Sequence, residues 1–133
     1  MLILDTNALV WLTNDDRRLG DDARRAIDDA WANGEAAVSA ITFWEIAMLQ
    51  AKRELDSVAD AGTLRARLFQ YGLHEIPVDG EIGIEATQLA DFHRDPADRI
   101  IVATAALGDH QLVTSDGKIL DWKGHLRRLD ARQ

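Results

Sequence analysis

The sequence predicts a single α/β domain, in which a mainly parallel sheet of four or five strands is flanked by helices on both faces. The length of 133 residues fits one domain. Short apolar runs alternate with amphipathic stretches, as in chains of βαβ units. The first run, Leu2–Leu4, is apolar without interruption, which favours a strand buried on both faces. Asp5 follows it directly, and in open α/β sheets ligands bind beyond the carboxyl ends of the strands.

The predicted strands are short apolar runs bounded by polar or turn residues. Pro77 suits the end of its strand better than the centre. The last strand would lie at an edge of the sheet and would be followed by a basic, frayed tail. We expect strands at residues 2–4, 36–38, 73–78, 111–114 and 126–129.

The predicted helices combine apolar positions at helical spacing with residues that cap helix ends. Thr6 or Asn7 would cap the first helix, and Gly34 would end the second. In the helix at residues 81–92, we expect Ile82 and Ile84 to belong to the core. We expect helices at residues 8–12, 21–33, 60–71, 81–92, 96–107 and 119–122, and one from Ser39 or Thr42 to about Arg53.

The net charge restricts the possible partners. With 23 acidic and 15 basic residues the chain has a formal charge of −8. This argues against a nucleic-acid partner, because phosphate contacts need basic groups. The objection weakens if several acids share one pocket and bind divalent cations, since bound ions reverse the local charge.

The composition also indicates the cellular setting. There is no cysteine, so neither a disulfide framework nor a thiolate metal site is possible. No apolar stretch approaches the roughly 20 residues that span a bilayer, and no basic leader precedes the first strand. We therefore expect a cytoplasmic protein that is neither exported nor bound to a membrane.

Four acids have a common place to meet in this topology. Asp5 and Asp116 end strands, while Glu45 and Asp98 lie in the first turns of helices that begin at the same edge of the sheet. Carboxylates are hard oxygen ligands suited to Mg²⁺ or Mn²⁺. Motifs of competing chemistries are absent from the sequence: there is no Walker-type phosphate loop, dinucleotide glycine fingerprint, nucleophile-elbow serine or His-Glu-x-x-His motif.

Four short motifs, in this order and spread over essentially the whole chain, carry a family resemblance. The sequence resembles the PIN-domain family, and especially the VapC toxins of bacterial and archaeal type II toxin–antitoxin pairs. The motifs are Leu4-Asp5-Thr6-Asn7, Ser39-Ala40-Ile41-Thr42-Phe43-Trp44-Glu45-Ile46-Ala47, Asp95-Pro96-Ala97-Asp98-Arg99-Ile100-Ile101-Val102-Ala103 and Thr114-Ser115-Asp116.

The resemblance implies a PIN-like domain with Mg²⁺- or Mn²⁺-dependent ribonuclease activity that leaves a 5′-phosphate and a 3′-hydroxyl. It also implies a homodimer that is silenced by a VapB-like antitoxin. Thr6 and Ser115 match polar positions that support the pocket, and Asn7 stands where some relatives carry His. Asp95 is the alternative to Asp98 as the inner ligand. The metal ligands, which are also the catalytic residues, would be Asp5, Glu45, Asp98 and Asp116.

Each acid also has a purely structural interpretation. Asp5 could cap a helix, and Thr42 with Glu45 has the spacing of a capping box. Asp98 could stabilise a helix dipole, and Asp116 before a glycine is ordinary turn chemistry. Only the convergence of all four favours a site.

Two other functions remain open from the sequence. One is a phosphohydrolase or phosphoacceptor domain in which Asp5 is phosphorylated and Lys118 is its partner. The other is an inactive PIN-fold module that binds a protein. The four histidines have no ligand-type spacing, so we expect them on the surface or in loops, with His93 nearest to a motif. The four tryptophans are expected in the core or at a dimer interface.

Overall fold

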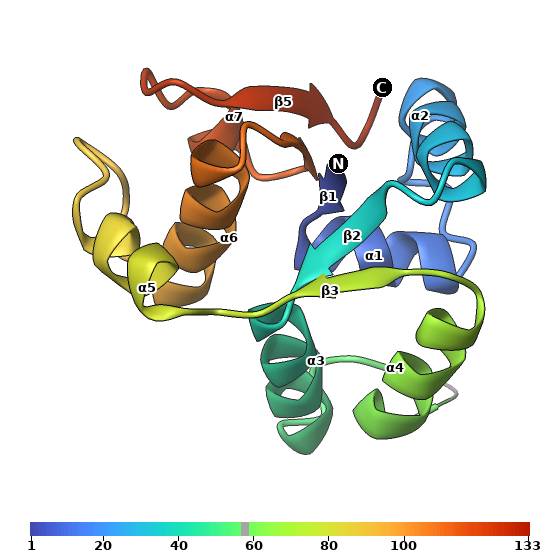
Figure 1. The fold of residues 1–133 in the computed structure, drawn as a ribbon. Coiled ribbons are helices and arrows are strands. Elements are labelled where there is room, and N and C mark those ends of the chain that lie inside the picture. Colours follow the sequence, from blue (N-terminus) through green and yellow to red (C-terminus); the bar gives the residue numbers. More distant parts are fainter. Residues whose placement is uncertain (57–58) are drawn as a thin grey trace.

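A five-stranded parallel sheet organises the protein (Figure 1). The computed structural model describes residues 1–56 and 59–133. The strand order is β3-β2-β1-β4-β5, and all four strand pairs are parallel. The predicted fold class is thereby confirmed. The strands are β1 (Leu2–Leu4), β2 (Ala36–Ser39), β3 (His74–Ile76), β4 (Gln111–Thr114) and β5 (Arg127–Asp130).

Helices cover both faces of the sheet, which is why the central strands are apolar without interruption. In β1, Leu2 and Leu4 pack into one core cluster with α1, α2, α3 and α4, whereas Ile3 packs into a second with α6 and α7. Among the described residues the helices are α1 (Thr6–Thr13), α2 (Asp21–Ala32), α3 (Ile41–Ala51), α4 (Ala61–Gln70), α5 (Gly80–Thr87), α6 (Pro96–Leu107) and α7 (Gly117–Leu120). None of these helices has the length and apolar character needed to cross a membrane.

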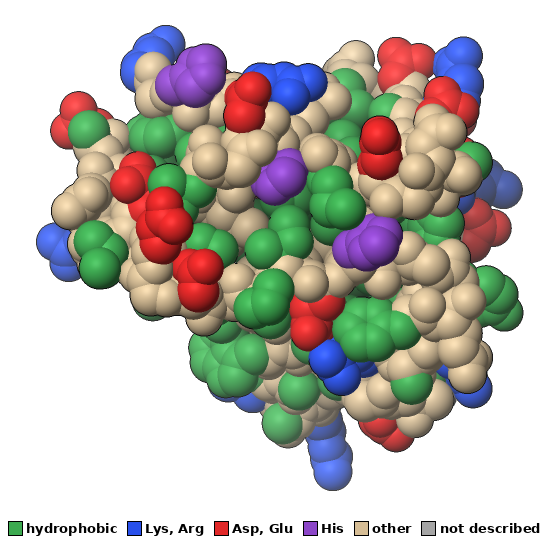
Figure 2. Space-filling view, viewed as in Figure 1, with side chains coloured by type: hydrophobic (Ala, Val, Ile, Leu, Met, Phe, Trp, Pro, Cys, Tyr) green, Lys and Arg blue, Asp and Glu red, His purple; other side chains and the backbone are tan. Residues whose placement is uncertain are grey.

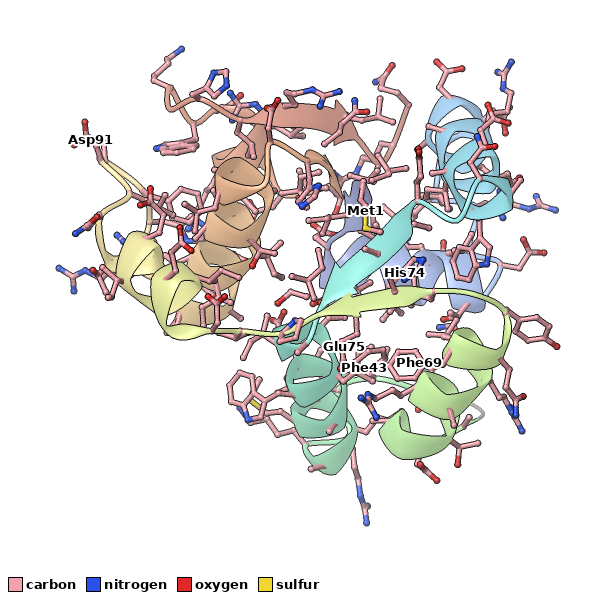
Figure 3. All side chains as sticks on the ribbon, in the orientation of Figure 1. Met1, Phe43, Phe69, His74, Glu75 and Asp91 are labelled. Atoms are coloured by element: carbon pink, nitrogen blue, oxygen red, sulfur yellow. The ribbon has the colours of Figure 1, made fainter. Side chains whose placement is uncertain are left out.

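Helix α4 packs beside α3 through aromatic side chains. The rings of Phe43 and Phe69 meet edge to face with centroids 6.3 Å apart (Figure 3). The guanidinium of Arg65 lies over Phe69 and also pairs with Glu75 of β3, with Nε and Oε1 2.8 Å apart. The ion pair joins α4 to the edge strand β3, and the Phe43–Phe69 contact joins α4 to α3, the helix that carries Glu45.

Three details differ from the sequence-based expectations. Asp5, rather than Thr6 or Asn7, caps α1: its Oδ1 accepts a hydrogen bond from the Ala8 N–H at 2.8 Å. Helix α5 ends at Thr87, five residues before the predicted end at residue 92. Ile84 is 62% exposed rather than part of the core. An apolar residue on an exposed helix face needs no core position when its neighbours bury the other face, as Ile82 does here.

The prediction of a frayed C-terminal tail is wrong. Ala131 is fully buried, and its N–H donates to the carbonyl of Thr114 at 2.8 Å. The N–H of Gly20 donates in turn to the Ala131 carbonyl. Arg132 donates from Nη1 to the Ser115 carbonyl and lies over the ring of Trp11. The tail therefore supports the loop that leads to Asp116.

Candidate functional site

The carboxyl ends of two neighbouring strands bring the first two acids together. Strands β1 and β4 pair in parallel with Leu4 opposite Val113, and the Asp5 N–H donates to the Val113 carbonyl at 2.9 Å. Asp5 follows β1 directly, and Asp116 follows β4 after one intervening residue. Both acids therefore lie at the same edge of the sheet, as the topology predicts.

Asp5 is buried, with both carboxylate oxygens hydrogen bonded. Only 6% of the surface of this residue is exposed to solvent. Oδ1 accepts from Ala8, and Oδ2 accepts from the Thr114 hydroxyl at 2.5 Å. Burial raises the pKa of Asp5 above its ordinary value, and the charge of Asp116 adds to this, although the hydrogen bonds oppose it. Asp5 is therefore a carboxylate whose charge needs compensation.

Thr114 ties the two strand-end acids to each other. Besides its bond to Asp5, its hydroxyl oxygen accepts from the Asp116 N–H at 3.1 Å. Ser115 supports the same turn through its backbone, because its N–H lies within hydrogen-bonding reach of Asp5 and its carbonyl accepts from Arg132. Sequence reasoning found Ser115 but missed Thr114, which looks like an ordinary β-branched strand residue.

Glu45 reaches the site from α3. Its Oε1 accepts from the Thr6 hydroxyl at 2.5 Å, and Thr6 also lies 3.2 Å from the Thr42 hydroxyl. The residue that caps α3 is Ala40, without a side-chain hydrogen bond. The structure thus replaces the capping-box interpretation of Thr42 and Glu45. Burial raises the pKa of Glu45, and the charges of Asp95 and Asp5 raise it further.

The two acids at the start of α6 have different roles. Asp95 caps the helix: its Oδ1 accepts from the N–H groups of Ala97 and Asp98 at 3.0 and 3.2 Å. Asp98 points its carboxylate at the other acids. Burial raises the pKa of Asp98 to about 8, and the charges of Asp95, Asp116 and Glu45 contribute. Asp98 is thus the acid of this turn that faces the other carboxylates.

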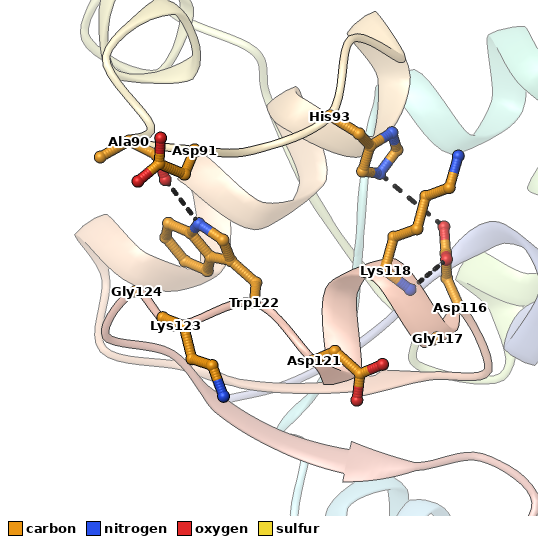
Figure 4. A pocket seen from close by; sticks show the side chains of 10 residues that line it. All are labelled: Ala90, Asp91, His93, Asp116, Gly117, Lys118, Asp121, Trp122, Lys123 and Gly124. Carbon is orange, nitrogen blue, oxygen red and sulfur yellow. Dashed lines mark hydrogen bonds and ion pairs between the residues drawn. The ribbon is translucent and has the colours of Figure 1, made fainter.

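His93 is a second residue of the site that the sequence did not reveal. Its Nε2 lies 3.2 Å from Asp98 Oδ2. The same nitrogen lies 3.9 Å from Asp116 Oδ2 (Figure 4). That nitrogen is buried and has no hydrogen-bond partner among the described residues. The ring stacks on Phe92, with centroids 4.5 Å apart. His93 lies in the loop between α5 and α6, as expected, but its side chain is close to the acids of the site rather than free at the surface. Its position two residues before Asp95 was the only signal in the sequence.

His93, Asp98 and Asp116 together offer ligand atoms that all lie within 4.8 Å of one another. They line a cavity of about 590 Å³ together with Arg94, Asp95 and Lys118. Other acids are spread over the surface, for example around α5 (Figure 2). Asp98 in the cavity differs from these surface acids because burial and the charges of its neighbours raise its pKa. Asp5 and Glu45 do not line this cavity but lie near its acids, and burial raises their pKa values as well.

Fold and site define an α/β protein with an acidic pocket at the carboxyl edge of a parallel sheet. Residues 2–123 match the family model of the PIN domain. The chain is 33% identical over 121 residues to Ribonuclease VapC22 of Mycobacterium tuberculosis. The matched segment covers 89% of this chain and 88% of that protein. The chain therefore belongs to the PIN domain family, and the resemblance seen in its four motifs is confirmed.

Solved structures with the same fold come from toxin–antitoxin complexes. A toxin–antitoxin complex from Klebsiella pneumoniae is similar with a TM-score of 0.68 and 26% identity, covering 98% of both chains. VapBC2 from Rickettsia felis, bound to a DNA fragment from its promoter, has a TM-score of 0.71 at 18% identity and covers 96% of both chains. The second likeness shows the fold alone.

Proposed function

We propose that this protein is a VapC-like endoribonuclease toxin that hydrolyses RNA phosphodiester bonds with the help of Mg²⁺ or Mn²⁺ and is neutralised by a cognate antitoxin. The similarity to Ribonuclease VapC22 over most of both chains supports the activity. The observation that carries the proposal is the partly buried acidic pocket, in which the pKa of Asp98 is raised to about 8. Side chains with strongly shifted pKa values are typical of catalytic sites.

The residues present fit a divalent cation. Carboxylate oxygens are the ligands of Mg²⁺ and Mn²⁺. His93 Nε2 lies 3.2 Å from Asp98 Oδ2 and 3.9 Å from Asp116 Oδ2, so these three side chains are close enough together to hold one cation. The proposed ligands are Asp5, Glu45, Asp98 and Asp116, with His93 in addition.

When bound, such an ion polarises the scissile phosphate and activates a water molecule for attack. The protein itself contributes position and charge. The hydroxyls of Thr6 and Thr114 orient Glu45 and Asp5 by hydrogen bonds of 2.5 Å. Asp98 retains a proton near neutral pH until a cation compensates its charge, because burial and the neighbouring acids raise its pKa to about 8. Asp95 holds the first turn of α6 and thereby the position of Asp98.

Asp5 is poorly placed for the alternative role of a phosphorylated nucleophile. Its two oxygens already accept hydrogen bonds from Ala8 and Thr114, and the residue is almost completely buried. A nucleophilic carboxylate must itself reach the phosphorus atom in line, which needs an oxygen at the surface. Metal ligation needs only one of the lone pairs that the two hydrogen bonds leave free on the Asp5 carboxylate. The acidic cavity, in contrast, is open at Asp98 and Asp116. The inactive binding module has no observation in its favour.

We propose a VapB-like antitoxin and a second copy of this chain as protein partners. The toxin–antitoxin complex from Klebsiella pneumoniae supports the first. Trp44 on α3 and Ile84 on α5 are 56% and 62% exposed and would be available for contact with such a partner. A cytoplasmic location stays a prediction.

The test of the proposed function is a metal-dependent cleavage assay. Purified protein should cut single-stranded RNA when Mg²⁺ or Mn²⁺ is present, and EDTA should stop the reaction. Incubation with acetyl phosphate, followed by trapping of phosphoaspartate, should leave Asp5 unlabelled. RNA that stays intact with either ion, or a labelled Asp5, would contradict the proposal.

Mn²⁺ bound to this protein should have one nitrogen ligand, supplied by His93. Pulsed EPR of the Mn²⁺-loaded protein is expected to show ¹⁴N modulation from an imidazole, which His93→Gln removes. The variant should also bind Mn²⁺ about tenfold more weakly while its affinity for Mg²⁺ changes less, because imidazole nitrogen is a softer ligand than a carboxylate oxygen.

The matched control for this experiment is His125→Gln, which alters an exposed histidine outside the cavity. It should retain the nitrogen modulation. A wild-type spectrum without nitrogen coupling would show that His93 stays outside the coordination sphere.

A further inference from the structure

A second cavity adjoins the acidic pocket and has no role in the proposed chemistry. It has a volume of about 780 Å³, within the range of sites that enclose small ligands. Three residues, His93, Asp116 and Lys118, line both cavities, so the two are continuous (Figure 4). Trp122 and Lys123 line its outer part. Whatever enters this cavity lies next to the acids.

Trp122 forms a rigid aromatic wall in this cavity. Its indole Nε1 donates to the Ala90 carbonyl at 2.8 Å, as the close-up shows (Figure 4). Phe92 meets the ring edge to face, with centroids 5.5 Å apart. The ring also packs against Gly124 so closely that a Cβ at this glycine would lie 2.1 Å from it. The indole is thus fixed on several sides and yet partly exposed to the cavity.

Basic side chains stand at the junction of the two cavities and at their rims. Lys118 is held at its backbone, since its N–H donates to Asp116 Oδ1 at 2.9 Å, but its side chain is exposed. Arg94 lines the acidic cavity and Lys123 the neighbouring one. In the part of the chain that the structure describes, none of these three cations forms an ion pair. They are available to an anionic ligand.

We propose that this cavity binds the nucleotide adjacent to the scissile phosphodiester, with its base stacked on Trp122 and its phosphate paired with Lys118. The inference rests on the proposed ribonuclease function. Aromatic rings stack on bases of any sequence, and lysine contacts the backbone, so this combination is typical of single-stranded nucleic-acid sites. In a chain with a charge of −8, Lys118, Lys123 and Arg94 offer positive charge to the strand on a surface that also carries Asp91 and Asp121.

The proposal predicts separate effects for the two residues. With EDTA present to prevent cleavage, a short fluorescein-labelled single-stranded oligoribonucleotide should bind Trp122→Leu about tenfold more weakly than wild type, while Trp122→Phe keeps most of the affinity. Lys118→Ala should weaken binding severalfold and lower the slope of log affinity against log salt by about 0.7, since one phosphate contact is lost. Lys118→Arg should restore the slope.

Trp31→Leu and Lys52→Ala are the matched controls. The Trp31 indole also donates to a backbone carbonyl, that of Tyr71, but it lies on α2 outside the cavity. Lys52 is exposed at the end of α3. Both controls should bind RNA like wild type. Equal binding by Lys118→Ala and wild type, with an unchanged salt slope, would overturn the proposal even if Trp122→Leu fails to fold.

Cleavage kinetics distinguish this inference from the proposed function. In the presence of Mn²⁺, Lys118→Ala and Trp122→Phe should raise KM more than they lower kcat, because the contacts bind the substrate beside the reacting atoms. Wild-type protein that cleaves RNA together with variants of unchanged KM would refute the nucleotide site alone. Wild-type protein that leaves RNA intact would refute the ribonuclease function itself.

Discussion

Replacement of Asp98 by Asn is expected to lower RNA cleavage by about 10³-fold or more, because the variant loses a ligand of the proposed metal, whose electrostatic contribution to the reaction amounts to several kcal/mol. The same change should stabilise the metal-free protein. In the wild type, burial and the charges of Asp95 and Asp116 raise the pKa of Asp98 to about 8, so its ionisation is unfavourable. Asparagine cannot ionise. Cleavage rates and thermal melting of one protein preparation measure both effects.

Asp95→Asn and Asp121→Asn are the controls for that experiment. Asparagine caps helices about as well as aspartate, so the bonds from Ala97 and Asp98 should survive at position 95. Asp121 is exposed and lines only the neighbouring cavity. Both variants should retain most of the cleavage activity. An active Asp98→Asn protein and an inactive Asp95→Asn protein would assign the inner ligand to Asp95 instead.

The second large effect concerns pH and metal together. The pKa of Asp98 lies at about 8 in the folded protein, above its ordinary value of 3.8, and the pKa values of Asp5 and Glu45 are also raised. Between these limits the folded state binds more protons than the unfolded state, so the stability of the metal-free protein falls as the pH rises from about 4 to about 8. A bound divalent cation removes this penalty, and its affinity should increase with pH as protons are released.

Thermal melting with EDTA and with Mn²⁺ measures this effect. The stabilisation by Mn²⁺ should be larger at about pH 8 than at about pH 5, by a Tm difference on the order of 5 °C, since each kcal/mol shifts the Tm of a chain of this size by roughly 3–5 °C. The comparison of wild type with Asp98→Asn isolates the contribution of the site. This matters because burial lowers the pKa of His110, which contributes stability that rises with pH. An equal effect of Mn²⁺ at both pH values would contradict the linkage.

Much of the site could be predicted because its acids follow from local patterns. A strand that ends in an acid places that acid at the carboxyl edge, and this applies to Asp5 and Asp116. Asp98 lies in the first turn of α6 and Glu45 in the second turn of α3, and both helices follow loops at the same edge. The family motifs pointed to the same four residues. The expected metal ligands were therefore predicted from order along the chain and from the right-handed parallel topology.

The hydrogen bonds of the site could not be predicted in this way. The Thr42 and Glu45 spacing suggests a capping box, but the structure pairs Glu45 with Thr6, 39 residues away. Asp5 and Thr114 are 109 residues apart and meet only because β1 and β4 pair in one particular register. Local spacing cannot reveal such partners, since a register shift by one residue would turn each side chain to the opposite face.

The sequence by itself determined the parallel α/β fold and the family, and it predicted the four acids proposed as metal ligands, because each depends on periodicity and on residues at element ends. Only the tertiary structure decided which carboxylate is free and what surrounds it. It assigned Asp95 to the helix cap and Asp98 to the acidic pocket, and it placed His93 and Trp122 beside them. The physical reason is that hydrogen-bond donors and acceptors far apart in the sequence become partners only when the segments that carry them pack together.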